Sequence, residues 1–137
     1  AVARRPLVDT KEHRLWLCEA DLAVKAFKIA IGRGGAGKRK QGDLKTPLGT
    51  YSLGSPRAST RFGIFIPIGY PTTEQSKQGF TGKDVGIHGP DRRFRWLGGA
   101  NNWMDWTQGC IAVATDDSIE EISNWVNLKK IRDIHVL

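Results

Sequence analysis

Two side chains able to do covalent chemistry lie beside glycine in this sequence. His88 lies in Gly-Ile-His-Gly-Pro at 86–90, and Cys110 lies in Thr-Gln-Gly-Cys-Ile-Ala-Val at 107–113. A cysteine attacks a carbonyl group as the thiolate, and a neighbouring histidine can take the thiol proton and return it to a leaving amine. The two residues are far apart in the sequence, so only the tertiary fold can make them neighbours. The pair predicts an enzyme with a cysteine nucleophile.

The glycines beside this pair have predicted roles of their own. Pro90 has no amide hydrogen and favours an extended Gly89, whose carbonyl could then accept a hydrogen bond from one ring nitrogen of His88. Gly109 precedes the cysteine and lets the acyl group of a substrate approach the backbone. The amides around 109–110 could then hold the developing oxyanion.

The segment between the pair, residues 89–107, shows neither helical nor strand periodicity. We expect it to form a wall or lid over a cleft, pinned by aromatic packing, because an indole ring covers a large area and keeps a hydrogen-bond donor. Its candidate substrate-binding residues, which join Gly109, are Trp96, Trp103, Arg92 and Arg95.

Metal and disulfide chemistry are less well supported. His13, His88 and His135 have no local ligand spacing, and the chain has no CxxC or HxxxH motif, so neither a metal nor a cofactor is expected. A disulfide between Cys18 and Cys110 would block the nucleophile. It is not expected, because a chain of 137 residues needs no covalent staple.

A basic, glycine-rich segment at 32–42 matches a phosphate-binding P-loop up to its last position. Arg39 stands where that motif needs Ser or Thr for Mg²⁺. Gly42 and Pro47 oppose the helix that a P-loop must open. We therefore expect a mobile connector here and no nucleotide site.

The chain carries 21 Lys and Arg against 14 Asp and Glu, a formal net charge of +7. This excess favours an anionic partner such as nucleic acid, a membrane surface or an acidic wall polymer. The clusters at 33–45 and 92–95 belong to no recognisable nucleic-acid module, and solvated basic loops explain them equally well. No apolar run approaches the ~18 residues of a membrane span. We expect no nucleic acid partner and no membrane insertion.

The periodicity predicts one mostly β domain, residues 1–137. A hairpin spans 13–31 with its turn at Ala20-Asp21, and its second strand is apolar on both faces, which is typical of a central strand. Shorter strands are expected after a bend at Gly49 and at 62–68, 85–88 and 131–137, and a loop is expected at 70–82.

One helix is expected at 116–126. Asp117 is its predicted N-cap, paired with Glu120 in a capping-box-like arrangement. Ile119, Ile122 and Val126 form one apolar stripe, joined at its edge by Trp125, and Lys129-Lys130 end the helix.

With these elements in place, the sequence resembles the L,D-transpeptidase (YkuD-like) catalytic domain of bacterial cell-wall enzymes. The resemblance rests on G-D-x-K-T-P-L-G-T-Y at 42–51, I-H-G at 87–89, and T-x-G-C-I at 107–111 followed by a helix. It implies a β-sandwich of mixed sheets with one main helix packed against it. It also implies that Cys110 is the nucleophile, His88 the general base and acid, and the Gly89 carbonyl the group that orients the imidazole.

The resemblance implies attack on the L-to-D peptide bond of a peptidoglycan stem peptide. A thioester forms, and an amine acceptor resolves it without ATP or metal. This would be a monomeric transferase of cell-wall biogenesis and cell shape in the periplasm or another extracytoplasmic site. The alternatives are a hydrolase of the same family, either an L,D-carboxypeptidase or an amidase that releases wall-attached protein, and a non-catalytic wall-binding module.

Two positions depart from the family pattern. Ala112 stands where many members carry arginine, and Gln108 where many carry histidine. Loss of the arginine affects the expected substrate contacts but not the nucleophile. One of three arginines is expected to supply the missing charge for a substrate carboxylate: Arg92, Arg93 or Arg95.

Overall fold

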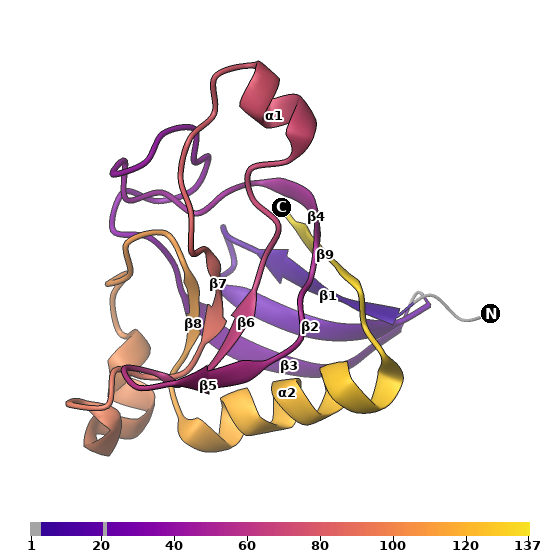
Figure 1. Cartoon of the computed structure of the whole chain (residues 1–137). Helices are drawn as coiled ribbons and strands as arrows, with labels where there is room; N and C mark the ends of the chain where they lie inside the picture. The colour runs from indigo at the N-terminus through magenta and orange to yellow at the C-terminus, as the bar shows by residue number, and fades with distance from the viewer. Residues whose placement is uncertain (1–3, 21) are drawn as a thin grey trace.

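The computed structural model describes residues 4–20 and 22–137 (Figure 1). In this part of the chain nine strands form one mixed sheet in the order β4-β9-β1-β2-β3-β8-β7-β6-β5. The strands are β1 Arg4–Asp9, β2 Arg14–Glu19, β3 Leu22–Ala30, β4 Gly49–Ser52, β5 Arg57–Ser59, β6 Gly63–Pro67, β7 Gly86–His88, β8 Ile111–Val113 and β9 Asp133–Val136. The helices are α1 Thr73–Lys77, the 3-10 helix η1 Arg95–Asn102, and α2 Asp116–Lys129.

The sheet curls around the core, because β3 belongs to both of its halves. β3 pairs along its length with β2, and its last residues, Ile29 and Ala30, pair with β8. The curl brings Leu53, directly after β4, into an antiparallel bridge with Ile68, directly after β6. The predicted mostly β, mixed fold is therefore confirmed, and the expected sandwich takes the form of one curled sheet.

The pairing of β7 with β8 brings the two motifs together. These short strands are parallel, with His88 opposite Ala112 and Ile87 opposite Ile111. Parallel neighbours need a long crossover connection, and residues 89–110, which include η1, provide it. All six strand residues are buried, so the register between the two motifs is determined by packing on both faces.

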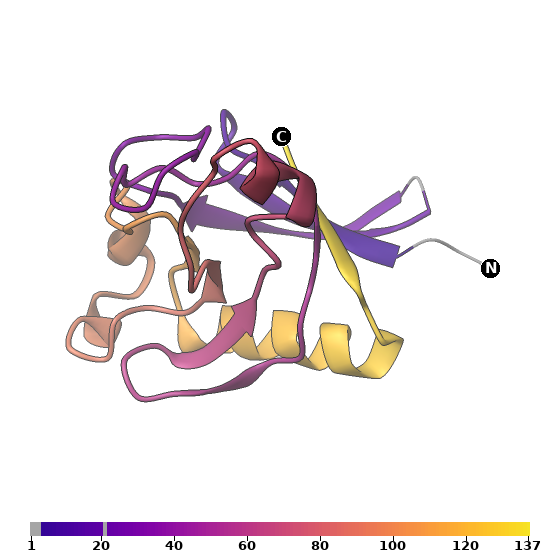
Figure 2. The ribbon, with the colours of Figure 1, turned by 45° about the horizontal axis from the view of Figure 1, so that its top comes forward.

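Helix α2 covers one end of the curled sheet, opposite α1 and the segment 32–42 (Figures 1 and 2). The predicted stripe is confirmed, since Ile119, Ile122 and Val126 are buried in the hydrophobic core. The predicted cap is wrong by two residues. The Thr115 side chain accepts the amide of Ser118, because Thr115 is extended and lies directly before the first helical residue.

Two further predictions fail for structural reasons. The first half of β3 is exposed, with Leu22 at 71% and Val24 at 53%, because the hydrophobic core contacts the strand only from Phe27 onward. The segment 70–82 contains the short helix α1, which begins at a capping box formed by Thr72 and Gln75. The turn predicted at Ala20-Asp21 lies partly outside the described residues.

Within residues 4–20 and 22–137, no helix has both the length and the apolar character needed to cross a membrane.

Candidate active site

His88 and Cys110 line the same cleft, which has a volume of about 880 Å³. The cleft walls come from the segment 33–44, the β5–β6 hairpin, the residues leading into β7, and the turn before β8. The fold thus places the two residues that the sequence singled out for covalent chemistry in one cleft.

The His88 ring is buried and held in one orientation. Its Nδ1 lies 2.7 Å from the Gly89 carbonyl oxygen, the contact expected from the sequence. A carbonyl oxygen only accepts hydrogen bonds, so Nδ1 carries the hydrogen and Nε2 keeps a free lone pair in the neutral ring. Position 89 also requires glycine, because a Cβ there would lie 2.9 Å from Cγ2 of Ile119 on α2.

Three aromatic rings enclose this imidazole. Phe62 stacks on it with ring centroids 3.6 Å apart and planes 14° apart, Trp106 presents an edge at 5.7 Å, and Phe65 lies at 6.4 Å. Burial lowers the pKa of His88 from 6.5 to about 4, and the charge of Arg61 adds to this, while the Gly89 hydrogen bond acts in the opposite direction. The imidazole is therefore neutral near pH 7 and able to accept a proton.

Cys110 lies directly before β8 and is half-buried. Its thiol donates to the Asp84 carbonyl oxygen at 3.4 Å. Burial raises the pKa of the thiol from 9.0 to about 11, against the opposing effects of the Gly86 amide and the Lys38 charge. The resting pair is a neutral thiol and a neutral imidazole, so the sulfur must lose its proton as it attacks.

Thr107 shapes the turn that presents the nucleophile. Its hydroxyl donates to the Cys110 carbonyl at 2.7 Å and accepts the Gly109 amide at 3.1 Å. Gly109 has φ +136°, and a Cβ there would lie 2.8 Å from the Lys45 carbonyl oxygen, so only glycine fits without strain. Because the Gly109 amide is already bonded, the Cys110 amide is the better candidate for an oxyanion contact.

The glycine-rich segment is a folded wall of the cleft and not the mobile connector that we predicted. Thr46 is fully buried, its hydroxyl accepts the Gly32 amide at 3.0 Å, and its carbonyl accepts the amides of Gly37 and Lys38. Lys38 is itself buried, and its ammonium group donates to Asp43 at 3.0 Å. The lysine of the apparent P-loop therefore lines the cleft, which its sequence context did not indicate.

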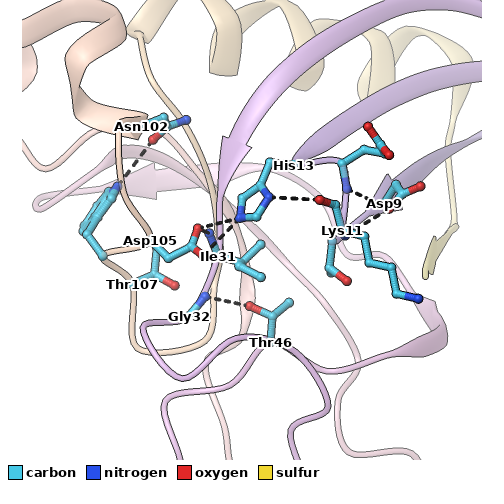
Figure 3. Close-up of polar contacts among 12 residues, drawn as sticks. Asp9, Lys11, His13, Ile31, Gly32, Thr46, Asn102, Asp105 and Thr107 are labelled. Carbon is cyan, nitrogen blue, oxygen red and sulfur yellow. Dashed lines mark hydrogen bonds and ion pairs between the residues drawn. The ribbon is translucent and has the colours of Figure 1, made fainter.

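Polar contacts hold the loop that carries Trp106 (Figure 3). The Asp105 carboxylate accepts the Ile31 amide at 3.0 Å and pairs with Nε2 of His13 at 3.0 Å. The Trp106 indole donates to the Asn102 side chain at 3.4 Å. These hydrogen bonds anchor the loop, and the Trp106 ring also packs against Phe62 and His88, with centroids 6.2 Å and 5.7 Å away.

Four of the predicted substrate-binding residues do not line the cleft. Trp96 and Trp103 are 77% and 80% exposed, Arg92 pairs with Asp116 of α2, and Arg95 also lies outside. The crossover runs over the N-terminal end of α2 before it returns, so only its last part, from Trp106 onward, reaches the cleft. Of the five predicted substrate-binding residues, Gly109 is the one that lines the cleft.

The positive charge of the cleft comes from other residues. Asp84 is the one acidic side chain among the described residues that line it, and the basic ones are Arg33, Lys38, Arg57, Arg61 and Lys83. The sequence did not indicate Arg57 and Arg61, because they lie in a polar turn region with no motif around them. The cleft is complementary to an anionic substrate.

A family model of the L,D-transpeptidase catalytic domain (YkuD) matches residues 3–134. The chain belongs to this family. L,D-transpeptidases are peptidoglycan enzymes of the bacterial cell wall, and the family assignment made from the sequence motifs is confirmed.

One related sequence and two similar folds illustrate what the chain resembles. The chain is 37% identical to YafK of Escherichia coli (strain K12) over 67 residues, which cover 47% of the chain and 27% of YafK. It shares its fold with Pgp2, the helical cell shape determining protein of Campylobacter jejuni, at a TM-score of 0.78 and 22% identity over 98% of the chain and 47% of Pgp2. An L,D-transpeptidase of Mycobacterium smegmatis matches at a TM-score of 0.64 and 11% identity, covering all of the chain and 59% of that protein. The chain thus spans about a quarter of YafK and less than half of Pgp2.

Both cysteines of this L,D-transpeptidase domain are free thiols. In the described part of the chain, no group of three or more His, Cys, Asp or Glu side chains is arranged to hold a metal ion.

Proposed function

We propose that this domain attacks the L-to-D peptide bond of a peptidoglycan stem peptide through Cys110 and passes the acyl group to an amine. One observation carries the proposal. The free Nε2 of a neutral His88, oriented by the Gly89 carbonyl, lies in the same cleft as the Cys110 thiol. A neutral imidazole is the form of histidine that can remove a thiol proton.

In the first half of the reaction, the Cys110 sulfur bonds to the substrate carbonyl carbon as its proton passes to Nε2 of His88. The Cys110 amide stabilises the oxyanion. The C–N bond then breaks, and His88 returns the proton to the departing amine nitrogen. The products are a thioester on Cys110 and a free D-residue.

In the second half, an acceptor amine gives a proton to the neutral His88 and attacks the thioester carbonyl. The C–S bond breaks, and the sulfur recovers the proton from His88. A new amide is released and the enzyme returns to its starting state. Water in place of the amine would give a carboxypeptidase, and this domain would then act as a hydrolase of the wall. Either reaction requires an extracytoplasmic location.

Intact-mass spectrometry after incubation with a carbapenem tests the nucleophile. The strained β-lactam carbonyl acylates an activated cysteine, so we expect the wild type to gain the mass of one drug molecule. Cys110→Ala should gain nothing, and Cys18→Ala, the matched control for the other thiol, should behave as the wild type. An unmodified wild type that also leaves a stem tetrapeptide intact would overturn the proposal and favour a wall-binding module.

The acceptor is identified by mass analysis of stem tetrapeptide products. A cross-linked dimer appears if an amine resolves the thioester, and a tripeptide appears if water does. Loss of both products in Cys110→Ala would assign them to the same thioester.

A further inference from the structure

We propose that Arg61 is a carboxylate-binding residue of the cleft, and that it recognises the α-carboxylate of the residue that leaves the acyl donor. This inference rests on the proposed function and names the feature of the donor that this part of the cleft would select.

Arg61 lies one aromatic ring away from the catalytic base. It belongs to the turn between β5 and β6 and lines the cleft. Its guanidinium lies over the Phe62 ring at 4.9 Å, and the same ring stacks on His88 with centroids 3.6 Å apart. The guanidinium and the imidazole therefore contact the same ring, and the Arg61 charge is close enough to lower the pKa of His88.

The position of His88 indicates which carboxylate reaches this charge. His88 returns its proton to the nitrogen of the departing residue, so that residue must occupy the His88 side of the cleft. The α-carboxylate of an amino acid is separated from its nitrogen by a single carbon atom. A departing D-residue bound next to His88 thus places its carboxylate near Arg61.

A buried carboxylate holds the Arg61 guanidinium in place. Nε of Arg61 donates to Oδ2 of Asp91 at 3.0 Å, and the Asp91 side chain is only 6% exposed. Hydrogen bonds from Arg93 and Arg61 hold the pKa of Asp91 well below its usual range despite its burial, so it stays charged. Within the described residues the Arg61 side chain makes no other hydrogen bond, which leaves its terminal nitrogens for a bidentate carboxylate contact.

Two other cations of the cleft, Lys38 and Arg57, are less suited to this contact. Lys38 is already paired with Asp43. Arg57 lies over Phe65, whose ring is farther from the imidazole than that of Phe62. Arg61 combines an ion pair with a buried acid, a planar contact with an aromatic ring, and an open guanidinium edge, and such pre-organisation limits the entropy lost on binding.

Arg93 provides a matched control. It donates to the same Asp91 through Nε and a terminal nitrogen, each at 3.1 Å, but its side chain is 72% exposed and it does not line the cleft. If Arg61 acted only through Asp91, then removing Arg93 would have the same effect on activity as removing Arg61. If Arg61 contacts the substrate, only the removal of Arg61 weakens substrate binding.

The experiment compares two synthetic stem tetrapeptides that differ only at the C-terminal D-residue, a free carboxylate in one and a carboxamide in the other. For the free acid, Arg61→Met should lower kcat/KM about tenfold or more, mainly through KM, because it removes a charge-assisted pair. For the amide, the same substitution should change kcat/KM less than twofold. Arg93→Met should match the wild type with both peptides, and Arg61→Lys should fall between the wild type and Arg61→Met.

Binding of the same peptides to Cys110→Ala, with and without Arg61→Met, gives a second readout that needs no turnover. The free acid should bind Cys110→Ala about tenfold more tightly than the double variant, and the amide equally to both. Equal losses for acid and amide, or an equal loss in Arg93→Met, would overturn the role of Arg61. Selective binding without any turnover by the wild type would instead support Arg61 and overturn the proposed reaction.

Discussion

The two histidines His88 and His13 each contact a hydrogen-bond acceptor, but their surroundings are opposite. His88 is 1% exposed, lies among three aromatic rings, and donates to the neutral carbonyl of Gly89. The His13 side chain is 37% exposed, and its Nε2 lies 3.0 Å from both carboxylate oxygens of Asp105. The histidine with the acidic partner has no nucleophile beside it, because the shallow depression around it contains neither cysteine.

The contrast shows which surroundings suit a histidine that accepts a proton. Burial among apolar groups favours the neutral form of an imidazole, and a carbonyl acceptor then fixes which ring nitrogen carries the hydrogen. In His88 the environment keeps the ring neutral, and in His13 the contact with Asp105 fastens the Trp106 loop to the turn between β1 and β2 (Figure 3). A histidine–aspartate pair is therefore a structural contact here, and the histidine without a carboxylate partner is the candidate base.

The largest effect that would sharpen this comparison is on acylation. His88→Gln should slow acylation of Cys110 by a carbapenem about 10²–10⁴-fold, because a general base is lost. His13→Gln should stay within about threefold, since it removes only a contact remote from the thiol. Time-resolved intact-mass measurements give both rates. Similar losses in the two variants would remove the distinction between the sites.

The second effect is on the pH dependence of the free energy of unfolding. The pKa of His88 is about 4 in the fold and 6.5 in the free side chain, so the unfolded chain takes up the proton first as the pH falls. The stabilisation is complete above about pH 6.5 and is lost between there and about pH 4, by about 3 kcal/mol. Urea unfolding should show this decline in the wild type and a shallower one in His88→Gln. Parallel declines would show that His88 titrates normally.

A smaller effect is expected at the glycine that orients His88. Gly89→Ala should lower the free energy of unfolding by about 1–3 kcal/mol, because its Cβ would press on Ile119. Gly99→Ala is the matched control, since a Cβ there meets nothing within 4 Å. Chemical denaturation measures both, and equal stabilities would mean that α2 moves aside without cost.

The smallest effect is expected at the half-buried pair of His13 and Asp105. Asp105→Asn keeps an oxygen for the Ile31 amide but loses the charge facing His13, so stability should fall by only about 1 kcal/mol or less. The carbapenem acylation rate should change less than twofold. A larger loss of acylation would mean that the Asp105 contact also positions Trp106 for the reaction.

Local signals predicted much of the fold. Strands were expected at the positions of β2, β3, β4, β6, β7 and β9, and the helix was expected where α2 lies, because alternation and an apolar stripe are properties of neighbouring residues. The exposed start of β3 and the Thr115 cap were not predicted. The exposure of β3 depends on what packs against the strand, and sequence periodicity does not contain that information. The cap depends on the residue at which the chain turns from extended to helical, and the periodicity of the apolar stripe does not determine that residue.

For the site, the sequence by itself determined which groups can react, a cysteine and a histidine. Each lies beside a glycine, and the backbone at both of these positions has no room for a larger residue. Tertiary structure decided everything that depends on distance. The parallel pairing of β7 and β8 brings the reacting groups into one cleft, Phe62 and Trp106 keep the imidazole neutral, and the crossover carries Trp96 and Trp103 away. Reactivity is a property of residue type, but desolvation and charge act through space, and only the folded chain sets those distances.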